Sequence, residues 1–469
     1  MILEGFQPDF PTPVTDEVNS FHAATGLDGG VRDLRALLWS SIDNTESRDL
    51  DQIEWAERTP EGHIRVRVAV ADVDAVVAAN SAADAHARIN ATSVYAGGPV
   101  FPMLPERLST DLTSLRQHAD RRAIVMEYVV GPDGQVLRSD VCQAMIRNRA
   151  RLNYDEVGRW LKSHAPAAAA PFQLAGLGEQ LLLQNEASQR LKALRKQHGA
   201  LVLGGEESAP IVVNNVVLGF AFTQDDPARD LIESFMVAAN VAMAEFLRAR
   251  NCLCLRRIVR APKRWDRIQA LAAPLGTKLP DAPDARALSE FMAQRKQADP
   301  DHFPELSLAV LKSLGPGEYA VEHPGAERQG HFALAVDDYS HATAPNRRYA
   351  DLTMQRLLKA CLTGSNAPFS ESALSDLAAH CTEREAAARH VERFMKKVAA
   401  AMMLAPQVGR VFDAMVTGGS PKGTFARLLT VPAEGRVMRG ERGLDVGDKF
   451  RARLAGVDAS KGFIDLERV

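Results

Sequence analysis

The sequence predicts an α+β protein in which one large mixed domain is followed by a small β-barrel, and three observations support this. The chain has 469 residues, which is too long for one simple core. Strand-type alternation occurs early in the chain, and long segments with apolar residues at helical spacing follow it. After Pro406, short alternating runs separated by Gly, Pro and Asp are typical of an antiparallel barrel of OB-fold size.

The individual elements follow in chain order. Residues 1–30 contain Pro and Gly without clear periodicity, so we expect an extended N-terminal segment. A strand is expected at residues 64–73, and a hairpin at residues 123–148 around the turn GPDG. Helices are expected at residues 76–90, 176–200 and 229–250, with two more between 349 and 403. The predicted division is an extension at 1–30, a catalytic domain at 31–403 and a barrel domain at 404–469.

Composition limits the location and the partners. The net charge of −3 gives no general indication of nucleic-acid binding, so any such site must be a local basic patch. No stretch of 18 apolar residues predicts a membrane span, and the N-terminus lacks the pattern of a signal peptide. The cysteines are scattered and odd in number, which indicates a reducing, cytoplasmic compartment and no disulfide framework. They are Cys142, Cys252, Cys254, Cys361 and Cys381.

An acidic segment, SIDNTESRDLDQ at residues 41–52, is the first candidate for chemistry. On an extended chain Asp49 and Asp51 point the same way, and a turn could bring Asp43 beside them. Three converging carboxylates without paired cations repel one another, and carboxylate oxygens are the ligands that Mg²⁺ or Mn²⁺ prefers. The alternative is a polar loop whose Asp residues cap turns, and the spacing alone favours that alternative.

A second segment, YSHATAPNRRYADL at residues 339–352, combines a helix start with two arginines. Pro345 ends the preceding structure, which places Arg347 and Arg348 in the first turn of a helix. Cations are unfavourable there unless an anion binds, and guanidinium groups fit phosphate oxygens. The alternative is a structural ion pair with Asp351, which we favour for Arg348 but not for Arg347.

Together the two segments resemble the RNB domain of the ribonuclease II/R family. The first resembles the family motif T-I-D-x5-D-x-D-D, and YSHATAPNRRYADLTMQRLLKA resembles Y-x-H-F-T-S-P-I-R-R-Y-x-D-L-x-x-H-R. VAVADV, TSVYAGGPVFPMLPERLSTDLTSL and LIESFMVAANVAMAEFL follow the family in the same order. Residues 389–393 resemble its A-E-R helix, and the last 60 residues resemble an S1 domain. The resemblance covers about residues 32–469.

The resemblance implies a metal-dependent hydrolytic exoribonuclease. It would act as a monomer on single-stranded RNA from the 3′ end and release nucleoside 5′-monophosphates. A mixed sheet wrapped by helices would form a central RNA channel. Mg²⁺ is the expected ion, with Mn²⁺ as the alternative, and the metal-ligand positions are Asp43, Asp49, Asp51 and Gln52.

The resemblance also assigns roles outside the metal-ligand positions. Arg347 would contact the phosphate near the scissile bond, Glu392 would lie near the 3′-terminal nucleotide, and Tyr95 would stack on the terminal base. We therefore expect Asp51, Arg347 and Glu392 to be catalytic. Arg348 matches a motif position among the RNA-binding residues, although we expect its role to be mainly structural.

The sequence departs from the family pattern in two important places. Gln52 replaces a fourth Asp, and its amide can ligate a metal but supplies no charge, so a second metal is in question. The family's two N-terminal cold-shock domains have no counterpart in the 30 residues before the match. RNA binding would then depend on the channel and the barrel, where Phe425 and Arg427 are the expected contacts. In the barrel we expect Phe412 to be core, whereas Arg436 is a candidate phosphate contact whose alternative is a solvated rim position.

Two alternatives have different functions. In the first, the chain is a catalytically weakened RNA-binding protein in which Gln52 marks a decayed site. The retention of three Asp, Arg347 and Glu392 argues against it. In the second, the chain is a metal-dependent phosphatase for small molecules, and the C-terminal barrel argues against that.

Overall fold

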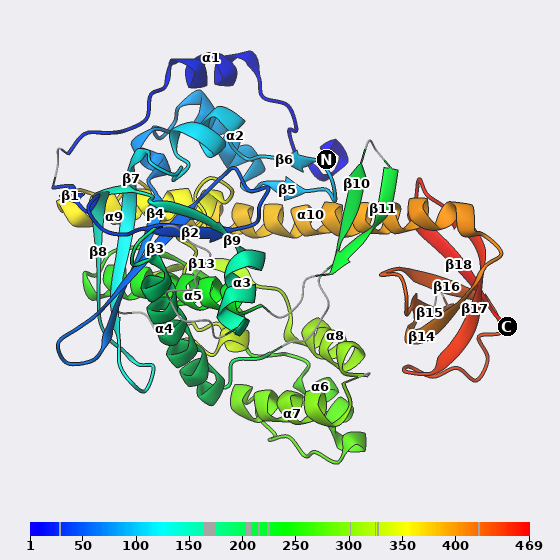
Figure 1. The fold of residues 1–469 in the computed structure, drawn as a ribbon. Coiled ribbons are helices and arrows are strands. Elements are labelled where there is room, and N and C mark those ends of the chain that lie inside the picture. The colour runs from blue at the N-terminus through cyan, green and yellow to red at the C-terminus, as the bar shows by residue number, and fades with distance from the viewer. Residues whose placement is uncertain are drawn as a thin grey trace.

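A seven-stranded mixed sheet forms the centre of the molecule in the computed structural model (Figure 1). The structure describes residues 1–27, 30–163, 174–202, 208–213, 216–222, 226–300, 302–323, 325, 328–420 and 423–469. Strands β1 and β8 pair in parallel, as do β2 and β9, and the other neighbours are antiparallel. The order across the sheet is β1 (Arg32–Asp33), β8 (Val136–Arg147), β7 (Asp120–Val130), β4 (Ile64–Ala71), β3 (Gln52–Arg58), β2 (Ser40–Asp43) and β9 (Ala150–Asn153).

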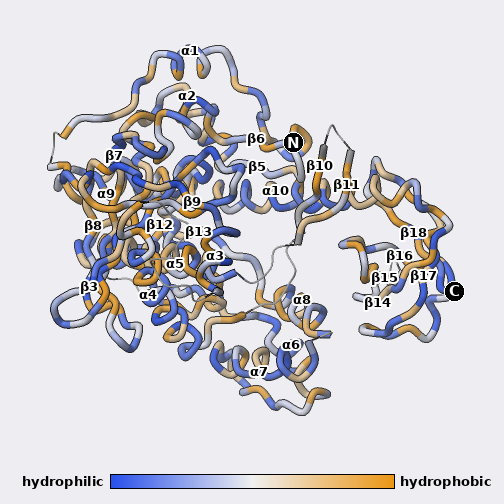
Figure 2. Tube along the Cα trace, in the orientation of Figure 1, coloured by the Kyte–Doolittle hydropathy of each residue, from blue (hydrophilic) through white to orange (hydrophobic). Residues whose placement is uncertain are grey.

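Helices α3 (Tyr154–Ser163), α4 (Leu177–His198) and α5 (Pro227–Ala249) pack together against the sheet. The apolar residues of α5 recur at helical spacing and are buried, as the sequence predicts. One of them, Phe235, meets Tyr128 of β7 edge to face with ring centroids 6.3 Å apart. Figure 2 shows hydrophobic residues running through the sheet and α5, which mark the main core.

Two long helices in the second half of the chain confirm the prediction for residues 349–403. Helix α9 (Tyr349–Thr363) packs beside the sheet and is buried along its first three turns. Helix α10 (Glu371–Leu404) crosses the molecule and leads to the barrel (Figure 1). Three shorter helices lie between α5 and α9 in the sequence and form a core of their own. They are α6 (Trp265–Ala272), α7 (Ala285–Ala298) and α8 (Phe303–Leu314).

The remaining short elements connect these layers. The predicted hairpin with GPDG at its turn is β7–β8, whereas α2 begins six residues later than expected because Ser81 caps its N-terminus. The two-stranded sheets are β5 (Val94–Tyr95) with β6 (Val100–Phe101), β10 (Ser208–Val213) with β11 (Val216–Phe222), and β12 (Cys254–Ile258) with β13 (Glu318–Glu322). Helix α2 spans Ala82–Asn90. The other short helices of this part of the chain are η2 (Val73–Ala75), η3 (Arg107–Leu112), η5 (Ala273–Leu275), η6 (Phe332–Leu334) and η7 (Ala405–Gln407).

The N-terminal segment is not extended throughout, and the prediction is wrong for its two helical stretches. It contains η1 (Ile2–Glu4) and α1 (Thr12–Ser20), while residues 28 and 29 lie outside the described ranges. Helix α1 forms because Pro is tolerated in its first turn, and Val14 and Val18, one turn apart, are buried against the rest of the protein.

The C-terminal region is a closed five-stranded barrel, which confirms the predicted OB-type fold. Its core contains Phe412, 6% exposed, as the sequence predicts. Gly435 is required where strands approach closely, since an added Cβ would lie 2.8 Å from the Ile464 carbonyl oxygen. Around the barrel the strands are β14 (Val411–Ser420), β15 (Gly423–Leu428), β16 (Glu434–Arg439), β18 (Phe463–Arg468) and β17 (Lys449–Asp458).

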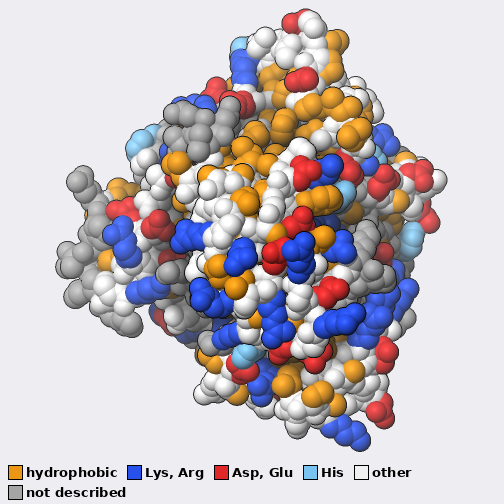
Figure 3. Space-filling model, turned by 90° about the vertical axis from the view of Figure 1, so that its right-hand side faces the viewer, with side chains coloured by type: hydrophobic (Ala, Val, Ile, Leu, Met, Phe, Trp, Pro, Cys, Tyr) orange, Lys and Arg blue, Asp and Glu red, His pale blue; other side chains and the backbone are white. Residues whose placement is uncertain are grey.

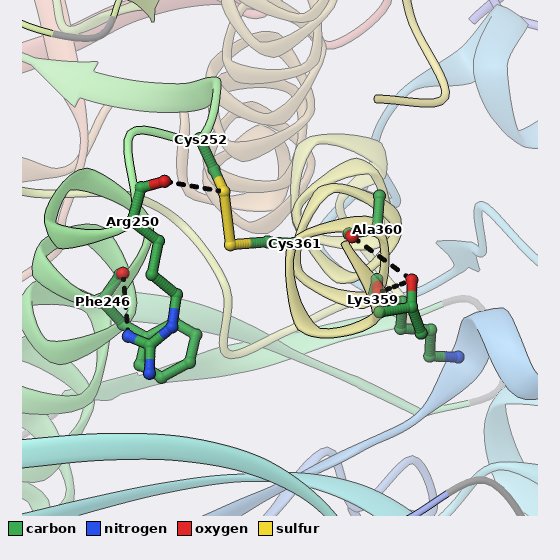
Figure 4. The surroundings of a disulfide bond; sticks show 7 residues. Phe246, Arg250, Cys252, Lys359, Ala360 and Cys361 are labelled. Carbon is green, nitrogen blue, oxygen red and sulfur yellow. Dashed lines mark hydrogen bonds between the residues drawn. A yellow bond between two sulfur atoms is a disulfide. The ribbon is translucent and has the colours of Figure 1, made fainter. Parts of the chain in front are cut away.

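One disulfide corrects the prediction made from the cysteine count. Cys252, just after α5, is bonded to Cys361 near the end of α9, and their Cα atoms are 6.2 Å apart (Figure 4). The sequence could not indicate this pair because 109 residues separate its members. Among the described residues, no helix is long and apolar enough to span a membrane.

Candidate active site

The acidic segment and the arginine segment meet at Asp51, whose partner Asn346 lies 295 residues later in the chain. Asp51 directly precedes β3 and is 4% exposed. Its carboxylate accepts a hydrogen bond of 2.7 Å from the Asn346 amide, and the Arg347 Nε lies 3.8 Å from its other oxygen. Thr113 fixes the Asn346 amide by donating to its oxygen at 2.7 Å. Asn346 was missed in the sequence, although it lies directly before Arg347.

The loop between Asp43 and Asp51 is held from both sides. The Arg151 guanidinium donates to the Thr45 and Ser47 carbonyl oxygens at 2.8 and 2.7 Å. Asp43 ends β2, and its carboxylate accepts from the Ser47 hydroxyl and the Asn44 N–H, both at 2.7 Å. The capping role that was the alternative reading of this motif is therefore present for Asp43.

Burial and like charges make the acidic segment electrostatically unfavourable. Burial raises the pKa of Asp51 to about 7, against the opposing effects of the Arg347 charge and the Asn346 hydrogen bond. Burial also raises the pKa of Asp49, where the Asp43 charge adds to the effect and the Arg347 charge opposes it. Arg347 therefore acts on two of the predicted metal ligands.

The two arginines differ in their surroundings, as predicted. Arg348 donates two hydrogen bonds, of 2.8 and 2.7 Å, to Asp351, whose carboxylate is fully buried. The Arg347 side chain is 44% exposed and faces Asp51 instead. Helix α9 begins at Tyr349 with Arg348 as its N-cap, so neither arginine lies in the first turn and that prediction is wrong.

Tyr95 and Glu392 lie on the other side of the site, and we call these two residues the clamp. The Tyr95 N–H donates to the Glu392 carboxylate at 3.1 Å, and the Tyr95 side chain is 43% exposed. Burial raises the pKa of Tyr95, and the charges of Arg347, Asp49, Asp51 and Glu392 all act on it. The predicted residues of both segments are therefore neighbours around Tyr95.

Backbone hydrogen bonds join the clamp to the arginine segment. The Ser93 N–H donates to the Arg347 carbonyl at 3.0 Å, and the Tyr349 N–H donates to the Ala91 carbonyl at 2.9 Å. This pairing fixes the position of Tyr95 relative to Arg347.

The N-terminal segment supports the clamp from behind. Phe6, 2% exposed, packs in one cluster with Val94 and Val391, the residues next to Tyr95 and Glu392. Arg384 of α10 donates to the Glu4 carbonyl at 2.7 Å and lies over the Phe6 ring. Sequence reasoning missed Phe6 because a single aromatic residue among prolines has no periodicity.

The predicted RNA-binding residues of the barrel are separate from this site. Phe425 and Arg427 lie on β15, at the far end of α10 from the sheet (Figure 1). Both are half-buried, and the Arg427 guanidinium is paired with Glu305 of α8. Arg427 therefore joins the barrel to the helices α6–α8.

The described part of the protein does not by itself present a complete set of metal ligands. Within the described ranges, no three His, Cys, Asp or Glu side chains lie close enough together to hold a metal ion. The donor chemistry nonetheless fits a hard divalent cation, because the Asp43, Asp49 and Asp51 carboxylates repel one another. In addition, both oxygens of the buried Glu54 have no hydrogen-bond partner. A site at Asp43, Asp49, Asp51 and Gln52 remains a prediction.

Comparisons with known proteins identify the family of the catalytic region. A model described as the RNB domain matches residues 31–364. The chain is 29% identical over 442 residues to Ribonuclease R 1 of Lactococcus lactis, covering 90% of this chain and 52% of that protein. It thus spans about half the length of this relative.

Two solved structures have the same fold. RNase R of Mycoplasma genitalium in complex with ribose methylated single-stranded RNA has a TM-score of 0.91 and 23% identity, covering 99% of this chain and 76% of that one. Yeast Ssd1, described as a pseudonuclease, has a TM-score of 0.71 and 17% identity, covering 94% and 55%. A second family model, described as the RNase II-type exonuclease C-terminal S1 domain, matches residues 410–469. The chain therefore belongs to the RNB family and ends in an S1 domain of the ribonuclease II type.

Proposed function

We propose that this chain is a hydrolytic 3′-to-5′ exoribonuclease that degrades single-stranded RNA to nucleoside 5′-monophosphates. The observation that carries the proposal is the contact of Asp51 with Asn346 and Arg347, together with the hydrogen bonds that join Arg347 to Ser93 and Tyr95 to Glu392. Acidic, cationic and aromatic groups at one place match the needs of phosphodiester hydrolysis at a chain end.

The acidic side would carry the hydrolysis. Asp43, Asp49, Asp51 and Gln52 would hold Mg²⁺, or Mn²⁺ as the alternative, and the ion would supply activation of water and charge for the leaving 3′-oxygen. Arg347 is partly exposed and faces the carboxylates, so it can add positive charge where the phosphate gains negative charge. Its planar group can donate two hydrogen bonds to phosphate oxygens.

The clamp would hold the end of the RNA. The exposed part of Tyr95 offers an aromatic face on which any base can stack, so binding would be independent of sequence. One oxygen of Glu392 is held by the Tyr95 N–H, and the other can accept from a hydroxyl of the terminal ribose. We assign catalytic roles to Asp51, Arg347 and Glu392, and base contact to Tyr95.

The barrel would supply general RNA affinity. Figure 3 shows Lys and Arg side chains gathered on the side of the molecule that carries the barrel. Such a surface favours the RNA backbone regardless of sequence. We propose residues 31–403 as the catalytic domain and 404–469 as the RNA-binding domain. Among the residues of this domain that the structure describes, the exposed basic ones are Arg410, Arg436, Arg439, Arg442, Lys449, Arg451, Arg453, Lys461 and Arg468.

We also propose that the chain works as a monomer in the cytoplasm, where single-stranded RNA is available as substrate. Size-exclusion chromatography with light scattering tests the oligomeric state, and cell fractionation tests the location.

The test of the function is incubation of the protein with single-stranded RNA labelled at its 5′ end, in the presence of Mg²⁺ or Mn²⁺. We expect a ladder that shortens one nucleotide at a time, together with nucleoside 5′-monophosphates identified by chromatography. Asp51→Asn is the control and should bind the RNA without shortening it. Absence of product with either ion contradicts the proposal.

The second candidate function is RNA binding without turnover. It is favoured by Gln52, which removes one charge from the acidic segment, and by the similarity of the fold to that of a pseudonuclease. It predicts RNA binding of equal strength in the wild type and in Asp51→Asn, with no product from either. The same labelled RNA therefore distinguishes the two candidates.

A further inference from the structure

A polar cavity with a volume of about 560 Å³ lies beside the acidic segment. Its walls include Arg48 and Leu50 of that segment, and the opposite wall comes from residues between 110 and 117. Asp49 and Asp51, which alternate with these two residues along the chain, do not line it. Pockets of about 300–1,000 Å³ commonly hold small organic ligands, so the cavity is large enough for one nucleotide.

The cavity and the candidate active site share one wall. The Leu50 N–H donates to the Ser114 hydroxyl at 3.1 Å, which fixes the acidic segment against its neighbour. The adjacent Thr113 donates to the Asn346 amide oxygen at 2.7 Å, and Asn346 in turn donates to Asp51 at 2.7 Å. The same short stretch of chain therefore borders the cavity and positions a group that contacts Asp51.

Two arginines of the cavity keep guanidinium groups that a ligand can use. Arg48 is 71% exposed, and its neighbour Glu106 at 3.9 Å is equally exposed, so this ion pair is weak. Arg151 donates to the carbonyl oxygens of Thr45 and Ser47, and both bonds use Nη2. The N–H groups on Nε and Nη1 of Arg151 are then left for a ligand.

A third arginine of the lining, Arg116, faces the carboxylate of Asp111. The two groups are 2.6 Å apart, and both side chains are about half exposed. Arg121 approaches the same carboxylate to 3.9 Å and donates to the Asp111 carbonyl at 3.0 Å. Asp111 therefore has two cations beside it, and positive charge exceeds negative charge in the lining. Such a lining favours an anion.

We propose that the cavity binds a nucleoside 5′-monophosphate through its phosphate group. The inference rests on the proposed function, of which this nucleotide is the product. A terminal phosphate carries nearly two negative charges at pH 7, and guanidinium groups donate paired hydrogen bonds to its oxygens. Arg48, Arg116 and Arg151 hold the phosphate. Gln117 donates its amide N–H to the Arg149 carbonyl at 3.0 Å, which leaves its oxygen to accept from a ribose hydroxyl.

The competing explanation is a group of solvated arginines that attracts any anion. In that case binding follows the net charge of the protein, and the loss of any two exposed arginines has the same effect. Inorganic phosphate then binds as well as the nucleotide does. The two explanations thus differ in properties that can be measured without RNA and without metal.

The experiment is calorimetric titration of the full chain with adenosine 5′-monophosphate in EDTA. We expect the double variant Arg48→Gln with Arg116→Gln to weaken binding about tenfold or more, because charge-assisted hydrogen bonds are lost. Adenosine and inorganic phosphate should each bind more weakly than the nucleotide by a similar factor.

The matched control is the double variant Arg32→Gln with Arg286→Gln, which removes the same charge elsewhere on the surface. These side chains are 56% and 71% exposed, as against 55% and 71% for Arg116 and Arg48, and each has a carboxylate neighbour. The control should bind the nucleotide like the wild type. Arg347→Ala should do so as well, because Arg347 lies at the candidate active site and not at the cavity.

Three results overturn the proposal: a wild type that binds no nucleotide, equal weakening in the two double variants, and loss of binding in Arg347→Ala. Inorganic phosphate that binds as tightly as the nucleotide also overturns it. If the double variant does not fold, Arg48→Gln alone takes its place and must weaken binding about threefold or more. Nucleotide binding that depends on Arg48 in a protein that does not shorten RNA supports the site and rejects the proposed function. RNA shortening without nucleotide binding has the opposite meaning.

Discussion

The acidic side and the clamp side of the site are stabilised in opposite ways. On the acidic side, Asp51 and Glu54 are buried, and the charges nearby include several of the same sign. On the clamp side, a backbone N–H satisfies Glu392, and Phe6 packs an apolar cluster behind it. The first surface keeps repulsion among its carboxylates, whereas the second is satisfied within the protein.

This difference indicates which part of the site a ligand must finish. Repulsion among carboxylates in the free protein is a cost that bound metal removes, so metal and fold should stabilise each other. The clamp has no such cost and should hold its shape with or without RNA. Disturbing each side should therefore give different results.

The largest effect is expected from Arg347→Ala, which removes the cation facing Asp51. Hydrolysis should slow by about 10²–10³-fold, as for the loss of a group that stabilises transition-state charge. The free energy of unfolding should change little, because the side chain is 44% exposed. Single-turnover assays and urea unfolding measure the two quantities.

Arg348→Ala is the matched comparison for Arg347. It leaves the buried Asp351 with the Ala344 N–H but without its cationic partner, and should lower the free energy of unfolding by about 3–5 kcal/mol. If both variants lose activity and stability to the same degree, the division into a functional and a structural arginine is wrong.

The second prediction concerns pH in the absence of metal. The pKa of Asp51 is raised to about 7, so the folded state keeps its proton while the unfolded state loses it from about pH 4. The free energy of unfolding should therefore fall as the pH rises from about 4 to about 7. At about 1.4 kcal/mol per pKa unit, the total decrease is up to about 4 kcal/mol. Urea unfolding in EDTA across this interval measures the slope.

Asp51→Asn is the control for the pH prediction and should lack this part of the slope. Added Mg²⁺ should also flatten it in the wild type, because a bound ion favours the ionised carboxylates. A slope that is the same in the wild type and in Asp51→Asn would falsify the assignment to Asp51.

The third prediction concerns the clamp and is smaller. Phe6→Ala leaves a cavity behind Tyr95 and Glu392, and a small displacement of positioned groups should raise the KM for RNA by about tenfold while kcat changes less. Leu3→Ala, at a fully exposed position of the same segment, should behave like the wild type. Phe6→Leu should bring the KM close to the wild-type value. The Mn²⁺ affinity should not change in Phe6→Ala, Leu3→Ala or Phe6→Leu.

Much of this site could be predicted because its residues lie in short stretches that resemble the family. The resemblance placed Asp51, Arg347, Tyr95 and Glu392 together, and the structure makes them neighbours. Glu54 could not be predicted, since the charged residues within IEWAER are equally consistent with an exposed strand face. Its burial depends on α4 and α5 packing over β3 and β4, which are long-range contacts.

The N-terminal segment and the disulfide were missed for the same kind of reason. Phe6 is buried by α10, which begins more than 360 residues later, and no local pattern marks that contact. The Cys252–Cys361 bond joins the ends of two helices whose packing determines the pairing. Local spacing predicts elements and motifs, whereas these contacts depend on the assembled tertiary structure.

The smallest effect is expected in the barrel, where Arg427 and Arg436 can be compared. Arg427 is paired with Glu305, so Arg427→Ala should cost below about 1 kcal/mol of stability and leave the salt dependence of RNA binding unchanged. Arg436 is exposed on the next strand, and Arg436→Ala should reduce the slope of log affinity against log salt by about one phosphate contact. Fluorescence anisotropy with a short single-stranded RNA measures both slopes. If Arg427→Ala changes the slope and Arg436→Ala does not, the ion pair with Glu305 opens when RNA binds, and Arg427 contacts RNA as the sequence predicts.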